Sequence, residues 1–409
     1  MESTQASESY GRPGDGGFDG REHNEVAQTS PKSVPDRERV QPTSGPRLRV
    51  AMLAPPWIPI PPPGYGGIEF VVDLLCNALV EQGHDIELFC APGSQSSAKV
   101  HTLLDAPHPE SIGLSLFEAD HVARALGLID SAARDGEPFD VVHDHSGYTA
   151  LAMADRIELP LVHTVHGPFD DDTKPYYSAQ GSKGALVCIS HAQAGDAPRG
   201  ANVHSVVHNP IDIDSWPVGL HKQDYLLWLG RIVPEKGPHR AIKVARATGR
   251  PLVIAGNVQP RYERFFATQV QPHIDGQQIR YVGEVGGARK QRLFADAFAF
   301  LMPIRWPEPF GMVMVESLAA GTPVLAFAHG AAPEIIEHGV NGFLVQDEEE
   351  MAAVVERAGE LDPMQVRRSA ERFAPDRVAA GYEAAYRDVL ANAGRTPRAA
   401  QPAGAHATA

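Results

Sequence analysis

Short apolar runs alternate with amphipathic stretches along most of this chain. The runs are rich in Val, Ile and Leu and are bounded by Gly, Pro or His, a pattern typical of buried strands. The stretches 68–82, 238–247 and 311–320 carry apolar residues every three or four positions and are expected to be helices. Strands are expected at 48–53, 85–90, 141–145, 161–166, 186–190, 203–208, 225–230, 251–255, 279–283, 299–303, 323–327 and 342–345.

Two blocks of strands separate at 208–224, a polar stretch that contains two prolines and interrupts the periodicity. Each block has about six strands alternating with helices, which predicts a parallel sheet covered on both faces. The expected fold class is therefore α/β, with two tandem Rossmann-like domains over 47–215 and 216–371. Because ligands bind beyond the carboxyl ends of such strands, we expect the domains to face a central cleft.

The two ends of the chain differ in composition from this region. Residues 1–46 are rich in Gly, Pro, Ser and Glu, and residues 394–409 are rich in Ala, Pro and Gly. Neither segment can bury enough apolar surface to offset the chain entropy lost on folding. Both are therefore expected to be disordered tails, and the residues between them make two full domains and no third.

Charge and cysteine content narrow the function classes. The 409 residues include 36 Lys and Arg against 51 Asp and Glu, a net charge of −15, which argues against nucleic acid binding and disfavours membrane association. Cys76, Cys90 and Cys188 each lie in an apolar run and are expected to be buried. We expect a cytoplasmic protein, since no apolar run of about 18 residues and no signal-peptide pattern is present.

Two candidate anion sites each follow the first strand of a block. Gly66 and Gly67 open a helix, where glycine lets the backbone approach a ligand and unpaired N–H groups attract an anion. Arg231 and Lys236 follow a strand in the second block, and together they suit a phosphate. Taken alone, the two glycines are also compatible with simple turn geometry, and the two cations are also compatible with solvated surface charges.

Two carboxylates, Glu308 and Glu316, lie before and inside the helix expected to begin near Gly311. A carboxylate can accept hydrogen bonds from neighbouring hydroxyls, and the dipole at a helix start favours a diphosphate. The alternative is a solvated loop residue plus a helix-surface residue, which the glycine-rich and apolar surroundings disfavour.

Four histidines end two neighbouring strands, namely His143, His145, His163 and His166. Histidine at such a position can donate to a substrate, transfer a proton, bind a metal, or simply be hydrogen-bonded at the strand end. A metal-dependent hydrolase built on this group is one alternative function. It would need three or four converging ligands and a single eight-stranded barrel.

Taken together, these segments resemble the retaining glycosyltransferases of family 4, which have two Rossmann-like domains in the GT-B fold. The resemblance covers about 47–392 and rests on the order and spacing of several short motifs. The matching motifs are Gly66-Gly67-Ile68-Glu69, Val165-His166-Gly167, Asn209-Pro210-Ile211-Asp212, Gly230-Arg231, Glu235-Lys236-Gly237, Glu308-Pro309-Phe310-Gly311 with Glu316, Pro333-Glu334-Ile335-Ile336 and Asn341-Gly342.

The resemblance implies a nucleotide-diphosphate sugar (UDP-, GDP- or ADP-sugar) in the second domain and a hydroxyl acceptor on the first. It implies front-face displacement with retention, with no enzymic nucleophile, no metal and no cofactor, and a final helix, about 372–392, that completes the first domain. The acceptor is expected to be a soluble small molecule, or a glycan- or lipid-linked hydroxyl. The implied catalytic residues are Arg231, Lys236, Glu308 and His166, and the implied donor-binding residues are Gly66, Gly67, Phe310, Gly311, Met312 and Glu316.

Two positions depart from the family pattern. Ala331 stands where a second glycine often precedes Pro-Glu, and Asn257 stands where a small residue is common. Both lie in loops expected near the donor. A further alternative is a non-catalytic module that binds a sugar nucleotide without transferring the sugar, since it would share the donor-side residues.

Overall fold

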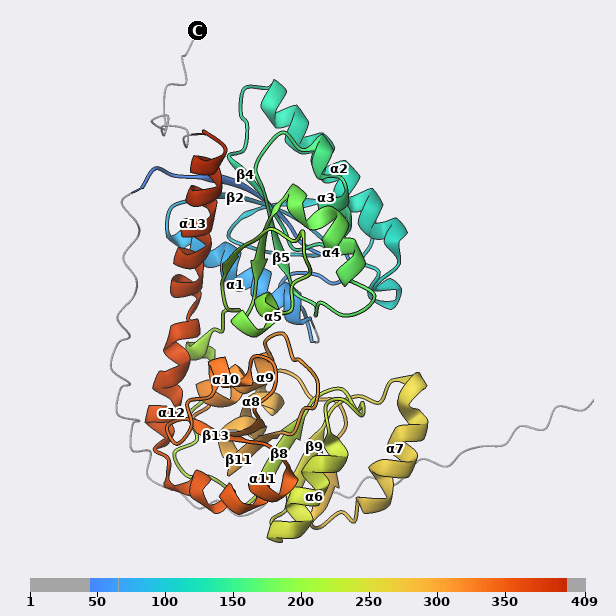
Figure 1. Ribbon diagram of the computed structural model, residues 1–409, viewed down its shortest axis with the longest axis vertical. Helices are drawn as coiled ribbons and strands as arrows, with labels where there is room; N and C mark the ends of the chain where they lie inside the picture. Colours follow the sequence, from blue (N-terminus) through green and yellow to red (C-terminus); the bar gives the residue numbers. More distant parts are fainter. Residues whose placement is uncertain (1–44, 65, 396–409) are drawn as a thin grey trace, which may run out of the picture. The chain divides into compact units, whose positions relative to one another are not determined.

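The computed structural model describes residues 45–64 and 66–395. Within these ranges the first half of the chain forms a seven-stranded sheet in which every pairing is parallel (Figure 1). Its strands are β1 (Arg49–Leu53), β2 (Asp85–Cys90), β3 (Lys99–Thr102), β4 (Val141–Asp144), β5 (Leu161–Val165), β6 (Ala185–Cys188) and β7 (Val203–Val206). They lie in the order β3-β2-β1-β4-β5-β6-β7. The helices of this half are α1 (Gly67–Glu81), α2 (Ser115–Arg134), α3 (Thr149–Ala152), α4 (Lys174–Gln180) and α5 (His191–Gly195).

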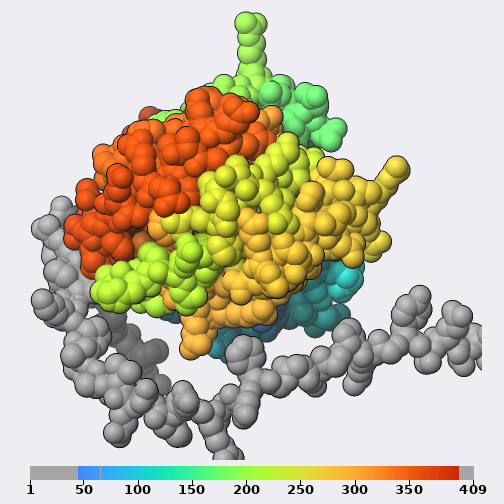
Figure 2. Space-filling view, turned by 90° about the horizontal axis from the view of Figure 1, so that it is seen from below, coloured from blue at the N-terminus to red at the C-terminus, as the bar shows by residue number. Residues whose placement is uncertain are grey.

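The second half forms another parallel sheet, of six strands among the described residues, in the order β10-β9-β8-β11-β12-β13. These strands are β8 (Leu226–Leu229), β9 (Leu252–Ala255), β10 (Ile279–Tyr281), β11 (Ala299–Met302), β12 (Val324–Phe327) and β13 (Gly342–Val345). The helices are α6 (Pro238–Thr248), α7 (Glu263–Gln269), α8 (Gly287–Asp296), α9 (Met312–Ala319), α10 (Ala332–Ile335), α11 (Glu348–Val354), α12 (Pro363–Ser369) and α13 (Pro375–Asn392). Figure 2 shows the face of this half on which α6, α7 and α11 lie.

Both sheets are buried on both faces, which explains their nearly continuous apolar strands. In β1, Val50 and Met52 belong to one buried cluster and Ala51 and Leu53 to another, because successive side chains point to opposite faces. The second sheet is likewise enclosed by two buried clusters. The prediction of two Rossmann-like α/β sheets is therefore confirmed.

All twelve expected strands are present, and the structure adds one that was not expected, β3. Its sequence is Lys-Val-His-Thr, and it pairs with β2 at the edge of the first sheet. Each of its residues is exposed or half-buried, so β3 produces no apolar run. The estimate of about six strands in the first block was therefore one too low.

The last helix, α13, packs against the first sheet although it follows the second in sequence (Figure 1). Tyr382 and Tyr386 are fully buried and share an apolar cluster with Leu48 and Met52. The three cysteines are free and buried, as expected. The predicted disordered tails, 1–46 and 394–409, fall outside the described residues except for 45, 46, 394 and 395.

Candidate functional site

Loops at the carboxyl ends of the second sheet hold most of the charged residues singled out in the sequence. Lys236 lies between β8 and α6, and its ammonium group forms an ion pair with Oε2 of Glu308. The same oxygen accepts a hydrogen bond from Nε1 of Trp306 at 2.8 Å, and the Lys236 nitrogen lies 5.1 Å from the centroid of the Trp306 ring. The pair is partly buried, with 18% and 13% of the two side chains exposed. The structure thus brings Lys236 and Glu308 into direct contact.

Arg231 lies on the same loop but is placed differently. Its side chain is half-buried, and its guanidinium has no hydrogen bond or ion pair with any described residue. Arg231 is therefore a positive charge whose five N–H donors are open to a ligand.

The loop before α10 holds the Glu308 segment in place through its backbone. The N–H of Ala331 donates to the carbonyl of Glu308 at 3.0 Å. Gly330 has a φ of +55°, and a Cβ there would lie 2.4 Å from the Glu308 nitrogen, so only glycine fits. The departure at Ala331 therefore leaves the sterically required glycine intact. Asn257 has an exposed side chain, and its carbonyl accepts from the N–H of Ile232.

Glu316 lies in the second turn of α9 and contacts a residue that the sequence did not single out. Its Oε1 accepts from the Lys290 ammonium at 2.6 Å, whereas its Oε2 is buried and has no partner among the described residues. A buried carboxylate oxygen without a donor is costly unless a ligand supplies one. Glu316 is therefore poised to accept a further hydrogen bond.

Phe310, Gly311 and Met312 form the start of α9. Phe310 is buried, with its ring centroid 5.6 Å from that of His208 and 5.7 Å from that of Phe373. Gly311 is the N-cap and has a φ of +86°, and a Cβ there would lie 2.8 Å from Cε of Met314. Met312 is the first helical residue and is half-buried. Glycine is therefore required at this cap, and no side chain occupies the helix start.

Gly66 and Gly67 behave differently from each other at the start of α1. Gly66 has a φ of +155°, and a Cβ there would lie 2.7 Å from the Pro62 side chain, so the fold itself requires it. A Cβ on Gly67 would meet no described atom within 4 Å. Packing therefore does not explain why Gly67 lacks a side chain.

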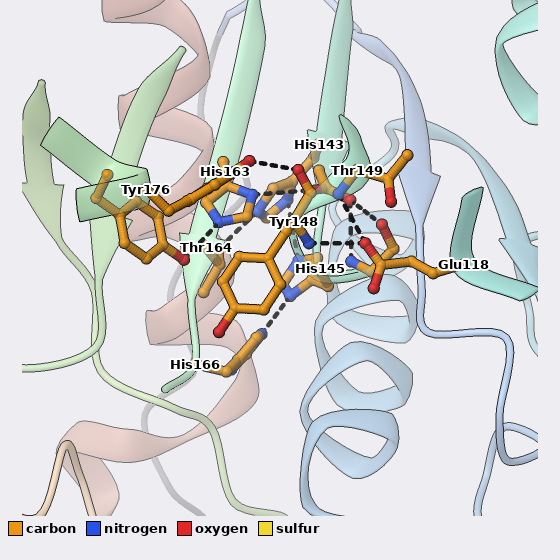
Figure 3. A network of polar contacts seen from close by, with 12 residues as sticks. Glu118, His143, His145, Tyr148, Thr149, His163, Thr164, His166 and Tyr176 are labelled. Atoms are coloured by element: carbon orange, nitrogen blue, oxygen red, sulfur yellow. Dashed lines mark hydrogen bonds and ion pairs between the residues drawn. The ribbon is translucent and has the colours of Figure 1, made fainter. Parts of the chain in front are cut away.

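The four strand-end histidines divide into two groups, because side chains alternate along a strand. On one face, Nδ1 of His145 lies 2.8 Å from Nε2 of His166, and Nε2 of His145 lies 3.3 Å from Nδ1 of His143 (Figure 3). On the other face, Nδ1 of His163 lies 2.6 Å from Oδ2 of Asp144. The alternative hydrolase would have drawn on all four histidines, but the alternation of side chains along β4 and β5 places His163 on the opposite face from the other three.

Burial keeps the first of these groups neutral. It lowers the pKa of His143 and His145 well below the usual value and lowers the pKa of His166 to about 3, and neighbouring histidines add to each effect. His166 is the most accessible of the three, being half-buried at the end of β5. Over the described part of the chain, no three His, Cys, Asp or Glu residues are arranged to hold a metal ion. Two open sheets, rather than one barrel, also contradict the hydrolase alternative.

A pocket brings residues from both sheets together beside Glu308. Its lining includes Phe169 and Gln193 from the first half and Glu308, Pro309 and Gly330 from the second. A larger hollow against α8, lined in part by three arginines, contains none of the predicted site residues. This gap between the two halves is narrow, with room for about one water molecule, and lies next to the Lys236–Glu308 pair.

Glu334 links the two halves beside this pocket. Its carboxylate accepts hydrogen bonds from the N–H groups of His191 and Ala192 at 2.8 and 2.7 Å and contacts Nε2 of His208 at 3.1 Å. Burial raises the pKa of Glu334, but the hydrogen bonds from His208 and the two N–H groups outweigh this and hold it below its usual value. An ionised carboxylate therefore fixes the start of α5 against the second half.

Sequence reasoning missed Lys290, Trp306 and Asp144 as partners of the site residues. Lys290 lies in the first turn of α8, just after Gly286 and Gly287, and Lys236 likewise lies beside a glycine N-cap, Gly237, so a signal was present. Trp306 and Asp144 carried no comparable signal, because their contacts depend on tertiary placement. Across 45–64 and 66–395, no helix is both long and apolar enough to cross a bilayer.

Comparison with known proteins extends these observations. The family model described as glycosyl transferases group 1 matches residues 211–373, and the one described as glycosyltransferase family 4 matches residues 65–215. The D-inositol 3-phosphate glycosyltransferase of Streptomyces scabiei is 28% identical over 361 residues, covering 73% of this chain and 80% of that protein. The glycogen synthase of Mycobacterium tuberculosis is 26% identical, covering 72% and 81%.

A solved structure shows the same architecture. The crystal structure of AviGT4, a glycosyltransferase involved in avilamycin A biosynthesis, superposes with a TM-score of 0.64 at 29% identity and covers 86% of this chain and 100% of that one. Two family models together match residues 65–373, which hold every described strand except β1, and the fold agrees with that of a solved glycosyltransferase. The chain therefore belongs to the group 1 glycosyltransferases of family 4 and has their GT-B fold.

Proposed function

We propose that this glycosyltransferase moves a hexose from a nucleotide-diphosphate sugar to a hydroxyl acceptor with retention of anomeric configuration. The observation that carries the proposal is the Lys236–Glu308 pair, which lies beside the pocket between the two halves, with the unpartnered Arg231 on the same loop. A departing nucleoside diphosphate carries strong negative charge, and a pair of fixed cations stabilises it.

Open helix starts add to this positive potential. Gly237, Gly286 and Gly311 are the N-caps of α6, α8 and α9, and none offers a side chain to the first-turn N–H groups. By contrast, the side chains of Ser190, Asp347 and Asp362 cap α5, α11 and α12. Helix starts left open at the carboxyl edge of a parallel sheet are suited to phosphate groups.

Each charged residue then has a distinct role. Arg231 and Lys236 bind the diphosphate, and the unpartnered Oε2 of Glu316 accepts a hydrogen bond from a ribose hydroxyl. Glu308 and the N–H groups of Phe310 and Gly311 bind hydroxyls of the donor sugar. Met312 contributes to the same surface at the helix start. Lys236 and Glu308 therefore fix each other as well as the donor.

The first half contributes the opposite wall of the site. Gly67 has open space where a side chain would be, so its backbone can approach the donor phosphate, and Gly66 supplies the turn that presents it. His166 contacts the donor sugar on the side of the reacting carbon. Closure of two walls over the donor excludes water, which would otherwise hydrolyse it.

In the reaction, the acceptor oxygen forms a bond to the anomeric carbon on the face from which the leaving group departs. The bond between that carbon and the phosphate oxygen breaks, and its electron pair stays on the diphosphate. The acceptor proton passes to the departing phosphate oxygen, so no enzymic base or nucleophile is needed. We expect no divalent cation or other cofactor to be required, because Arg231 and Lys236 supply the positive charge.

The relatives support the substrate class in coarse terms. The Streptomyces scabiei relative acts on an inositol phosphate, and a structural neighbour from Anabaena was solved with UDP-glucose (18% identity, TM-score 0.63, coverage 85% of this chain and 100% of that one). A UDP-, GDP- or ADP-sugar is therefore the proposed donor. The net charge of −15 favours a soluble acceptor over one in an anionic membrane.

A thermal-shift screen of nucleotide-diphosphate sugars tests the donor, because a ligand that binds the folded state raises the melting temperature. The stabilising donor is then incubated with hydroxyl acceptors, and the anomeric configuration of the product is read by NMR. A product of inverted configuration would refute retention. Binding without transfer or donor hydrolysis would favour a non-catalytic module, and loss of activity after dialysis against EDTA, restored by a divalent cation, would refute metal independence.

A further inference from the structure

A continuous chain of polar contacts runs from α13 through the core of the first half to His166. The Tyr386 hydroxyl lies 2.7 Å from Nδ1 of His143, and Nε2 of His143 lies 2.8 Å from Oγ1 of Thr164. The His143 ring is linked to His145, and His145 to His166, at 3.3 and 2.8 Å. Figure 3 shows His166 at the outer end of this chain, joined to His145.

The three histidines depend on one another for their tautomers. All are neutral near pH 7, because burial lowers the pKa of each ring well below that pH. A neutral imidazole has one N–H donor and one bare acceptor nitrogen. Each contact between two rings must therefore place a proton on one nitrogen only, so the tautomer of His143 decides that of His145, which decides that of His166.

Tyr386 selects between the two consistent arrangements. A phenol is a good donor and a poor acceptor, because its oxygen lone pair is delocalised into the ring, whereas a bare imidazole nitrogen is a good acceptor. The Tyr386 O–H therefore donates to Nδ1 of His143, and Nε2–H of His143 donates to Oγ1 of Thr164. Tyr382 makes the same kind of contact, with its hydroxyl 3.0 Å from Oγ1 of Thr164.

The remaining protons follow from this choice. The single lone pair of Nδ1 of His143 already accepts from Tyr386 at 2.7 Å, so His145 shares it through a longer and weaker contact of 3.3 Å, which needs a proton on Nε2 of His145. Nδ1 of His145 is then bare and accepts from Nε2–H of His166. This leaves Nδ1 of His166 without a proton, and no described residue donates to it.

We propose that His145, held by His143 and Tyr386, is a positioning residue that keeps His166 in the Nε2–H tautomer, so that His166 presents an acceptor to the donor sugar. The inference rests on the proposed function, because it assigns His166 to the sugar. It adds that the contact runs from a sugar hydroxyl to Nδ1 of His166, and that His166 does not supply a proton to the reaction. A sugar without a hydroxyl at this position would leave Nδ1 unpaired and be disfavoured.

The tautomer is measured directly by ¹⁵N NMR of the full chain labelled at histidine, without donor or acceptor. The two ring nitrogens of a neutral histidine resonate far apart, according to which one carries the proton. Loss of signals in His166→Gln assigns His166 among the 18 histidines. We expect a bare Nδ1 and a protonated Nε2 from pH 6 to pH 8, and a protonated Nδ1 would overturn the inference.

Tyr386→Phe removes the selecting hydroxyl, which is not part of the lining of the pocket beside Glu308, and keeps the aromatic ring. We expect a second His166 tautomer to appear and kcat to fall about three- to tenfold, with a smaller change in the donor KM. The matched control is Tyr225→Phe, which deletes another buried hydroxyl, one that donates to the Leu293 carbonyl at 2.8 Å. A purely structural role would make the two variants alike.

The outcomes separate this inference from the proposed function. A Tyr386→Phe enzyme with the kcat of Tyr225→Phe would overturn the positioning role. If no nucleotide sugar supports transfer while His166 has the expected tautomer, the proposed function fails and the tautomer assignment stands. His145→Phe provides a second variant, and we expect it to lower kcat at least as much as Tyr386→Phe does.

Discussion

The carboxyl ends of the two sheets differ in how their polar side chains are paired. At the edge of the first sheet, His143 and His145 are buried and neutral, and their ring nitrogens contact one another and Tyr386. At the edge of the second sheet, Lys236 and Glu308 are charged and partly exposed, and Arg231 has no partner among the described residues.

The difference assigns electrostatic stabilisation to the second sheet and the orientation of a ring to the first. A neutral group satisfied by its own neighbours cannot stabilise a developing charge, but it can hold a ring in one orientation. Unpaired charges and uncapped helix starts stabilise a developing negative charge, because they interact strongly with a bound anion. Substitutions at the second edge should therefore change the rate most, and those at the first edge should change orientation and acid stability.

The largest effect is expected for Lys236→Ala. It removes a cation beside the departing diphosphate and leaves Glu308 without its ion-pair partner. Loss of such a contact should lower kcat at least about tenfold, and by about a hundredfold if the contact strengthens in the transition state. Steady-state kinetics with the identified donor measures this.

The matched control is Lys243→Ala, an equal change of charge on the exposed side of α6. It should leave kcat within about twofold, because surface charges away from a site contribute little. Equal losses in the two variants would indicate a general charge effect and remove the special role of Lys236.

A smaller effect is expected for Glu316→Gln. The amide keeps the size of the side chain but loses the charge that pairs with Lys290 and weakens acceptance from a ribose hydroxyl. We expect the donor KM to rise about tenfold with a lesser change in kcat, since ribose binding is shared by ground and transition states. Glu360→Gln, an exposed carboxylate, is the control, and a fall in kcat at unchanged KM would contradict the assignment.

The smallest effect is expected for the stability of the protein in acid, which depends on the buried histidines of the first sheet. Burial lowers the pKa of His166 to about 3 in the folded protein, whereas the pKa in the unfolded chain is about 6.5. Between these two pH values His166 is protonated in the unfolded chain and neutral in the folded protein, so acid favours unfolding. The contribution of His166 to the free energy of unfolding is therefore fully present above about pH 6.5. It falls as the pH falls, by up to about 1.4 kcal/mol per pH unit for each such histidine.

Thermal unfolding of the wild type and of His166→Gln between pH 7.5 and pH 4.5 measures this contribution. The variant should lose less stability on acidification than the wild type, because it has one fewer group to protonate on unfolding. Parallel pH profiles would show that His166 titrates normally in the folded protein.

The sheets were predictable because each strand is buried on both faces and leaves an apolar run of its own. The edge strand β3 was not, since Lys99–Thr102 is half-exposed and pairs with β2 alone. The glycine caps at Gly237 and Gly311 were visible as glycines before helices, and their positive φ angles explain why. The fold was therefore readable wherever burial or backbone strain restricts the residue type.

The site was less predictable, because its pairings join distant segments. Nothing in the sequence pairs Lys290 with Glu316 rather than with another carboxylate. The division of the histidines was available in principle, because His143 and His145 share a strand face that excludes Asp144. Their link to Tyr386, 243 positions further along the chain, was not.

The position of α13 has a consequence for biosynthesis. Residues Pro375–Asn392 leave the ribosome after all of the second sheet, yet Tyr382 and Tyr386 complete the apolar cluster of the first sheet, which precedes it. The strands of the first sheet therefore keep part of their apolar face uncovered until α13 has been made, whereas domains generally fold in the order in which they are made. A chain cut short near residue 374 would damage the half of the protein farthest from the cut in sequence.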